Sequence, residues 1–248
     1  MKLFTCRQIA EIDRLTMQLE PTASIDLMER ASMQVADWLM RNIDRASPLW
    51  FFAGPGNNGG DALAVARLMA LTGFPCTVFL ADFGRDLKGD PAINRQRLKQ
   101  QGKVSLRTID SENSIPEIPE NVVVIDGLFG SGLNKPLDGL AAQIGRSINQ
   151  SGAKVISIDI PSGLFGEDNL QNDLSNVIRA SKTLTFQFPK LAFLFPENEC
   201  FFGDWEVLPI ALHPEAINQT ESSFFYLTKD FISGKITKRS KFSHKGTY

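Results

Sequence analysis

Short apolar runs alternate with longer segments of helical periodicity along most of the chain. Residues 48–53 (PLWFFA) and 121–126 (NVVVID) are almost continuously apolar, which is typical of strands that are covered on both faces of a sheet. Polar residues follow each of these runs directly. The same pattern predicts further strands at 76–81, 103–109, 154–160, 182–188 and 205–208.

Helices are predicted around and between these strands. In residues 24–41, apolar side chains recur at helical spacing, and Ser24 is a candidate N-cap. The other predicted helices span residues 6–18, 61–71, 88–101 and 139–150. Because strands that alternate with helices form βαβ units, the sequence predicts an α/β fold with a mostly parallel sheet and helices on both of its faces.

Composition and charge narrow the class of protein. The chain has 248 residues, of which 43% are hydrophobic, and a formal net charge of -2. The charge argues against a nucleic-acid partner, because such a surface needs clustered Lys and Arg. No apolar window is long enough to span a membrane, and the N-terminus lacks the apolar stretch of a signal peptide. Sparse cysteines without a CxxC spacing favour a cytoplasmic protein.

A glycine-rich turn follows the run at 48–53. Gly54, Gly56 and Gly59 have the GxGxxG spacing, which lets the backbone approach a ligand and presents a helix N-terminus to an anion such as pyrophosphate. A tight turn without a ligand is the alternative for the glycines alone. The turn also carries two amides and a carboxylate, which favour a binding loop: Asn57, Asn58 and Asp61.

Two further loops place carboxylates at strand ends. Asp126 ends the run at 121–126 and precedes Gly130-Ser131-Gly132, which can form a second nest of backbone N–H groups for phosphate. Asp159 follows KVISI and precedes Ser162. Each carboxylate could instead cap an ordinary turn. The oxygens of Asn58, Asp126 and Ser162 suit an alkali or alkaline-earth cation rather than zinc.

A fourth loop carries Lys190, just past the predicted strand 182–188. Its position just past a strand would allow Lys190 to face the site. A lysine in a loop is more often solvated than part of a site, and we expect that of Lys190.

Together, these segments resemble the YjeF N-terminal domain family, the NAD(P)HX epimerases. GPGNNGGDALAVARLM, DGLFGSGLNKP and DIPSGL are similar to the three loops of that family, and KTLTFQFPK and GDWEVLPIAL to its closing strands. The resemblance covers nearly the whole chain, although Ala62 stands where the family usually has glycine. It implies a Rossmann-like three-layer α/β/α sandwich that is commonly a homodimer.

The resemblance also implies roles for individual residues. It makes Asp159 the catalytic carboxylate and matches Asn58, Asp126 and Ser162 to the positions that hold one potassium ion per subunit. The implied substrate-binding residues are Asn57, Asn58, Gly59, Gly60, Asp61, Gly130, Ser131, Gly132, Leu133, Asn134, Lys135, Pro136 and Asp159.

The implied reaction interconverts the R and S epimers of NADHX and NADPHX at C6 of the hydrated nicotinamide ring. Loss and return of the C6 hydroxyl requires an acid and a base, and we expect Asp159 to serve as both, with its pKa raised by partial burial. Opening and reclosure of the ring is a second route. The alternatives are a non-catalytic dinucleotide-binding or scaffold module, and an NAD(P)-dependent oxidoreductase in which Asp82 would bind the ribose.

We expect residues 1–233 to form the epimerase domain and residues 234–248 to be a linker. That segment carries the basic residues Lys235, Lys238, Arg239, Lys241 and Lys245. Residues 241–248 resemble the opening of an ADP-dependent NAD(P)HX dehydratase domain. The predicted partner is therefore an ADP- or ATP-dependent dehydratase in the same full-length chain; a naturally short epimerase is the alternative.

Overall fold

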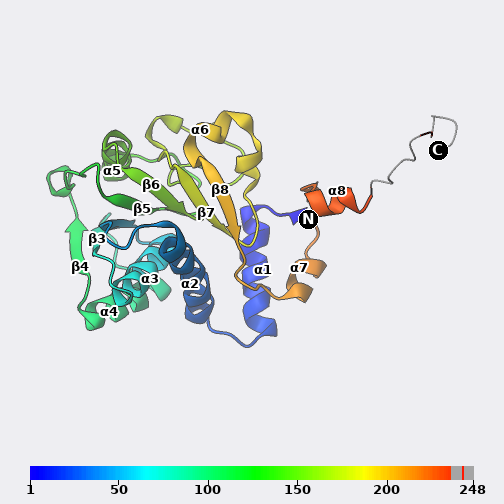
Figure 1. The fold of residues 1–248 in the computed structure, drawn as a ribbon, viewed down its shortest axis with the longest axis horizontal. Helices are drawn as coiled ribbons and strands as arrows, with labels where there is room; N and C mark the ends of the chain where they lie inside the picture. The colour runs from blue at the N-terminus through cyan, green and yellow to red at the C-terminus, as the bar shows by residue number, and fades with distance from the viewer. Residues whose placement is uncertain (236–241, 243–248) are drawn as a thin grey trace.

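Parallel strands form the central sheet of the protein (Figure 1). The computed structural model describes residues 1–235 and 242. The order of the strands across the sheet is β4-β3-β2-β5-β6-β7-β8, and every neighbouring pair in it is parallel. The strands are β2 (Leu49–Ala53), β3 (Cys76–Ala81), β4 (Ser105–Ile109), β5 (Val123–Gly127), β6 (Lys154–Ile158), β7 (Lys182–Phe186) and β8 (Asp204–Leu208).

The direction in which strands are added reverses between β2 and β5. The chain builds outward from β2 through β3 to β4, and then returns to place β5 on the other side of β2. The last residues of the two strands are paired, Ala53 with Gly127. Ligands of open parallel sheets bind beyond the carboxyl ends of the strands at such a reversal, so the fold predicts a site there.

Helices cover both faces of the sheet, which confirms the predicted three-layer α/β/α sandwich (Figure 1). Phe51 and Ile125 face one layer of helices, whereas their neighbours Phe52 and Val124 face the other. The first layer contains α2 (Ser24–Asn42), α3 (Asn57–Leu71) and α4 (Asp90–Gln101), and the second contains α5 (Gly139–Gln150). Alternate residues of a strand point to opposite faces, so each strand contributes to two cores.

Helix α3 lies at the centre of its layer and has no polar face over its first half. Residues 58–66 are all buried, because small residues let α2, α4 and the sheet approach closely. A Cβ atom on Gly60, for example, would lie 2.9 Å from the sulfur of Met28. The helix begins at Asn57 and not at Asp61 as predicted, so the polar residues of the glycine-rich loop form its first turn.

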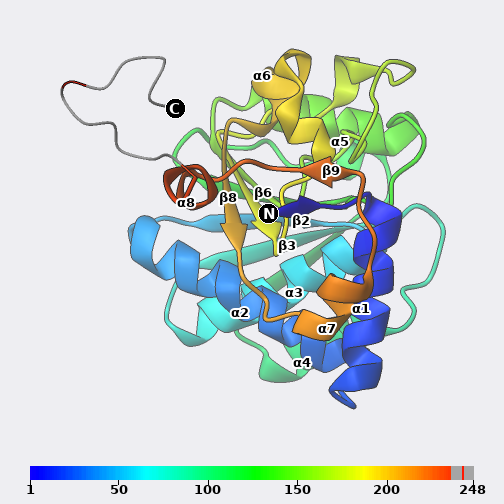
Figure 2. The same cartoon turned by 90° about the vertical axis from the view of Figure 1, so that its right-hand side faces the viewer.

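Segments from the two ends of the described chain pack together. Helix α1 (Cys6–Leu19) packs against α7 (Pro214–Gln219), and β1 (Lys2–Leu3) pairs antiparallel with β9 (Phe224–Phe225), so segments from the two ends of the chain lie side by side (Figure 2). The other short helices are α6 (Glu199–Phe202), α8 (Lys229–Ser233) and the 3₁₀ turns η1 (Glu112–Ser114), η2 (Leu174–Asn176), η3 (Leu191–Leu194) and η4 (Pro196–Asn198).

Several predicted boundaries were wrong for local reasons. Strands β6 and β7 end two residues early, because Asp159 and Gln187 have positive φ angles of 64° and 56°, which extended strands do not allow. Ala23, not Ser24, is the N-cap of α2, and the hydroxyl of Ser24 donates to the carboxylate of Asp90. Residues 236–241 and 243–248, which hold most of the predicted linker, lie outside the described residues.

Candidate active site

The glycine-rich loop packs directly against the loop that follows β5. A Cβ atom on Gly54 would lie 1.8 Å from the carbonyl oxygen of Leu128, and one on Gly59 would lie 1.8 Å from the carbonyl oxygen of Gly54. The N–H of Gly54 donates to the carbonyl of Gly127 at 3.1 Å. Only glycine fits these contacts, so the two glycines fix the N-terminus of α3 at the switch point of the sheet.

Three of the predicted site residues converge around Phe129, in the loop after β5. The Nδ2 of Asn58 donates to the carbonyl of Phe129 at 2.8 Å, and the N–H of Phe129 donates to the hydroxyl of Ser162 at 2.8 Å. The same hydroxyl donates to the carboxylate of Asp126 at 2.6 Å. Asn58, Asp126 and Ser162 therefore belong to one connected polar cluster, although they come from the start of α3, the end of β5 and the loop after β6.

Asp126 is fully buried and, among the described residues, has no cationic partner. Burial raises the pKa of its carboxyl, and hydrogen bonds from Ser162, Ser157 and the N–H of Leu128 partly offset that effect. The Oδ1 of Asn58 is also buried and lacks a hydrogen-bond partner. A buried carboxylate beside an unpartnered amide oxygen is a donor set that fits a monovalent cation with oxygen ligands.

The loop at residues 130–136 lies beside this cluster and reaches the surface. A Cβ atom on Gly130 would lie 3.1 Å from the Cβ of Asn58, so the first and second loops touch. Gly132, Asn134, Lys135 and Pro136 are exposed, whereas Ser131 and Leu133 are partly buried. In the first loop, Asn57 is exposed at the start of α3, and Asn58, Gly59, Gly60 and Asp61 are buried.

Asp159 lies just beyond the carboxyl end of β6, in the left-handed backbone region. Its N–H donates to the carbonyl of Leu184 at 2.7 Å, which holds the strained backbone in place. The Nζ of Lys190 donates to its Oδ1 at 2.6 Å. The side chain of Asp159 is 13% exposed, so a ligand can reach a carboxylate that the protein otherwise encloses.

The expectation that Lys190 is solvated was wrong. Its side chain is only 2% exposed, and its Nζ donates both to Asp159 and, at 3.1 Å, to the hydroxyl of Thr185. The neighbouring proline and apolar residues do not indicate this burial, and the available signal was the position of Lys190 just past a strand. The lysine is buried because η3 and the loop after β7 fold over the end of the sheet, an arrangement that only the tertiary structure determines.

Two further carboxyl groups lie near Asp159. Burial raises the pKa of Asp13, on α1, to about 6, while Lys190 lowers it and Asp159 raises it. Burial also holds the pKa of Asp61 well above its usual range, and the charge of Asp159 adds to the shift. Asp13 was missed in the sequence; the available signal was its place between Ile9 and Thr16, on the buried face of the helix.

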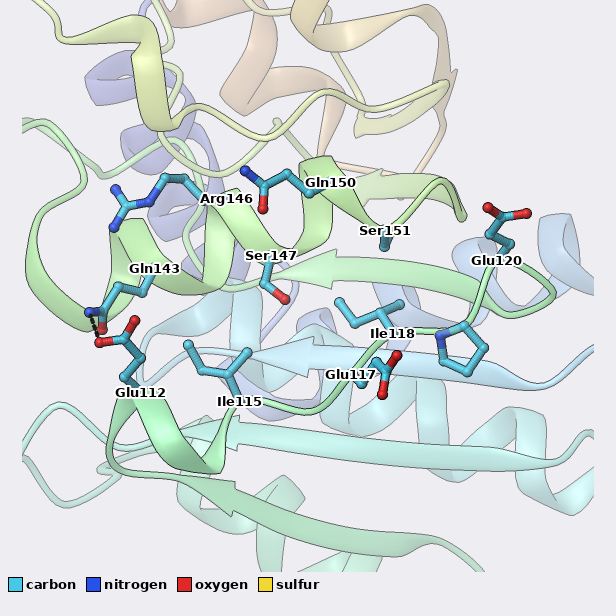
Figure 3. A pocket seen from close by; sticks show the side chains of 11 residues that line it. Glu112, Ile115, Glu117, Ile118, Glu120, Gln143, Arg146, Ser147, Gln150 and Ser151 are labelled. Atoms are coloured by element: carbon cyan, nitrogen blue, oxygen red, sulfur yellow. Dashed lines mark hydrogen bonds between the residues drawn. The ribbon is translucent and has the colours of Figure 1, made fainter.

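Other parts of the protein are weaker candidates for a ligand-binding site. Among the described residues, no group of three or more His, Cys, Asp or Glu could hold a metal ion. A surface hollow of about 670 Å³ lies between η1 and α5, where Glu112 accepts a hydrogen bond from Gln143 (Figure 3). None of the predicted site residues lines this hollow, so we assign the site to the carboxyl ends of the strands.

An open parallel sheet, covered on both faces, with a glycine-rich helix start at its switch point, places the protein in the class of Rossmann-like α/β proteins. The chain belongs to the family described as YjeF-related protein N-terminus, YjeF_N, whose model matches residues 24–192.

Named relatives agree with this family. The chain is 31% identical to an NAD(P)H-hydrate epimerase of Rhodopirellula baltica over 87% of this chain and 86% of that one. It is 33% identical to a bifunctional NAD(P)H-hydrate repair enzyme Nnr of Thermofilum pendens, and there it spans 47% of the longer protein. The crystal structure of the yeast protein ynu0 superimposes with a TM-score of 0.69 at 22% identity, covering 93% of this chain and 98% of that one.

Proposed function

We propose that the chain is an NAD(P)H-hydrate epimerase that interconverts the R and S forms of NADHX and NADPHX. The relatives that match along most of their length carry this name. The observation that carries the proposal is a partly exposed Asp159, ion-paired and fixed beside the glycine-rich helix start at the switch point. The exposed residues of the loop at 130–136 and Asn57 are then the candidate contacts for the dinucleotide, together with the buried residues 58–61.

The chemistry required is loss and return of one hydroxyl group. A proton added to the C6 hydroxyl lets it leave as water, while the lone pair of the ring nitrogen forms a planar iminium centre. Water then adds to the opposite face of C6 and gives up a proton. In this proposal Asp159 takes up a proton from solvent and passes it to the C6 hydroxyl. Its carboxylate then accepts the proton of the incoming water and releases it to solvent, so the enzyme returns to its starting state.

Replacing the carboxylate tests this role. We expect Asp159→Asn to lower the rate of epimerisation by about 10²- to 10⁴-fold, because an amide cannot exchange the proton. The interconversion of R- and S-NADHX would be followed by chromatography, or by coupling to an S-specific dehydratase. Asp204→Asn is the matched control, since Asp204 is exposed at the opposite end of the sheet. Full activity of a folded Asp159→Asn protein would refute the assignment.

We also propose that a potassium ion binds at Asn58, Asp126 and Ser162. The unpartnered Oδ1 of Asn58 and the unpaired buried charge of Asp126 support the proposal. A bound cation would supply a positive charge that holds the first and third loops together.

Thermal unfolding measures this binding independently of activity. We expect potassium to raise the melting temperature of the wild-type protein more than lithium does, and to lose that effect in Asp126→Asn. An equal response of the wild-type protein to both ions would contradict a selective site.

The longer relatives suggest a partner. Because the chain spans about half of the bifunctional repair enzymes, we propose that an ADP- or ATP-dependent dehydratase domain acts in the same full-length protein.

No helix in the described part of the chain is long and apolar enough to cross a membrane. We further propose a cytoplasmic homodimer. The unpaired cysteines and the exposed apolar side chains Phe225, Leu227 and Phe231 support it, and sedimentation of the purified protein tests the dimer.

A further inference from the structure

Three carboxyl groups and one ammonium group meet at the end of the sheet, and they come from four separate segments. Asp13 lies on α1, Asp61 on α3, Asp159 after β6 and Lys190 just before η3. The charge of Asp159 acts on both of the other carboxyls, and that of Lys190 acts on Asp13. The cluster therefore has more acidic groups than one positive charge can neutralise.

The ammonium group of Lys190 forms an ion pair with one of the three carboxyls. Lys190 forms an ion pair with Asp159 at 2.6 Å, and no such pair links it to Asp13 or Asp61 within the described residues. The hydroxyl of Thr185 is the second acceptor of its Nζ, and that hydroxyl also lies 3.3 Å from the carbonyl of Phe188. These contacts hold the ammonium on the side of Asp159.

The other two carboxyls, of Asp13 and Asp61, form no comparable ion pair among the described residues. Asp61 is buried and receives one long hydrogen bond, from Ser32 at 3.4 Å. The Oδ1 of Asp13 is buried without a partner. Neutral carboxyls tolerate such surroundings, whereas charged ones do not.

Three further titratable groups face the cluster. Cys6 lies on α1, and Glu167 accepts through its carboxylate from the N–H of Cys6. Asp90 lies at the start of α4, and its charge acts on Asp61. Burial raises the pKa of the Cys6 thiol to about 12, so it adds no charge.

We propose that Lys190 is the positioning residue that makes Asp159, and not Asp13 or Asp61, the ionised base of the epimerase site. This inference rests on the proposed function for its catalytic consequence, but not for the charge state it assigns. The ammonium fixes the direction of the Asp159 carboxylate and keeps it ionised at pH values at which Asp13 and Asp61 still hold their protons. Once Asp159 holds a proton, the same ammonium makes it a stronger acid, which favours transfer of that proton to the C6 hydroxyl that leaves as water.

This role differs from the one expected from the sequence. There, partial burial alone was expected to raise the pKa of Asp159. Burial by itself would favour a neutral carboxyl that donates but does not accept a proton. A buried ion pair keeps both states of Asp159 accessible during one cycle. The pair also explains why Lys190 is enclosed, since an unpaired ammonium there would be strongly unfavourable.

Titration of the wild-type protein provides the first test. Carboxyl carbons of aspartate would be titrated by NMR, with the three signals assigned through single Asp→Asn variants. We expect Asp159 to ionise at a lower pH than Asp13 and Asp61. If either of the other two ionises first, the inference is overturned, whether or not the protein epimerises NADHX.

Variants of Lys190 provide the second test. We expect Lys190→Met to raise the pH at which Asp159 ionises, to move the acid limb of the pH–rate profile upward by about one unit or more, and to lower kcat by about 10²-fold. Lys190→Arg should keep the acid limb near its wild-type position, because it keeps the charge. Lys182→Met is the matched control: Lys182 is paired with Glu206 at 3.2 Å, at the opposite end of β7.

The two proposals fail in different ways. A wild-type protein without epimerase activity, whose Asp159 still ionises first and shifts in Lys190→Met, would refute the proposed function and keep the assigned role of the lysine. An active protein in which a folded Lys190→Met variant loses activity but shows neither shift would reduce Lys190 to a structural residue and overturn the inference.

Discussion

At the scale of single residues, the buried carboxyls are the most unusual feature of the protein. Asp13 and Asp61 are held in surroundings that favour their neutral forms, and Asp126 is fully enclosed. Each of them costs folding free energy when it is charged, because the unfolded chain solvates a carboxylate better. Such groups persist in a protein when a site needs them, and all three lie at the carboxyl edge of the sheet.

The cost of Asp13 gives a prediction about stability and pH. Its pKa is about 6 in the folded protein, against an ordinary value of 3.8 for an aspartate in water, so the folded state binds the extra proton between these values. Stability from this group is present below the lower value and is lost as the pH rises through about 6. We therefore expect Asp13→Asn to stabilise the protein by about 1–3 kcal/mol near pH ~8 and to have little effect near pH ~3.5.

Urea denaturation at the two pH values measures the difference. Asp37→Asn serves as the control, because Asp37 forms an exposed pair with Arg41 at 3.7 Å on α2, where a charge contributes little. Equal effects of Asp13→Asn at both pH values would contradict the charged, buried state of Asp13.

At the scale of secondary-structure elements, the position of α3 decides the shape of the site. Its N-terminus is held between β2 and β5 by backbone contacts that leave no room for side chains at Gly54 and Gly59. The space around Gly127 is equally small, since a Cβ atom there would lie 2.6 Å from the Cβ of Ala62. Ala62, which departs from the pattern of the family, therefore sits at a close approach of the helix to the strand.

These contacts predict different effects for two glycines of the same loop. Gly54→Ala should destabilise the protein by about 3 kcal/mol or more, because its Cβ would overlap the backbone of Leu128. Gly56→Ala should cost less than about 1 kcal/mol, since a Cβ there meets nothing within 4 Å and its φ of -91° suits alanine. Thermal unfolding of the two variants makes the comparison, and a similar loss in both would contradict the close approach of the loops.

At the scale of the whole molecule, the two ends of the described chain stabilise each other. Strand β1 pairs with β9, the amino group of Met1 donates to the carbonyl of Tyr226 at 2.9 Å, and Gln8 donates to the carbonyl of Glu221. The segment that follows α7 thus belongs to the folded unit. This supports our proposal that the epimerase domain extends to residue 233 and that a linker begins at residue 234.

Truncation tests the proposed boundary. A chain that ends at Ser233 should keep the melting temperature of the full chain to within about 2 °C, because it retains β9 and α8. A chain that ends at Thr220 should melt more than about 4 °C lower, since it loses the β1–β9 pairing. Equal melting temperatures for the two truncated chains would place the boundary before β9.

The amino-acid sequence determined the elements and their class. Apolar runs covered on both faces, helical periodicity between them and glycines at the strand ends are local patterns, so the parallel α/β sandwich and the loops of the site follow from them. The same patterns identified Asn58, Asp126 and Ser162 as candidate ligands, each from its own segment. The sequence did not show the two-residue shortening of β6 and β7, because a positive φ at Asp159 or Gln187 depends on the contacts around each residue.

The tertiary structure alone decided which side chains meet. Asp13 and Lys190 are far apart in the sequence, yet α1 and the segment before η3 enclose them beside Asp159. Burial and charge pairing depend on atoms contributed by distant segments, and these determine whether a lysine is solvated or holds a carboxylate in its ionised form. Local sequence patterns do not specify which distant segments come into contact. The sequence therefore predicted where the site lies but not how its charges are paired.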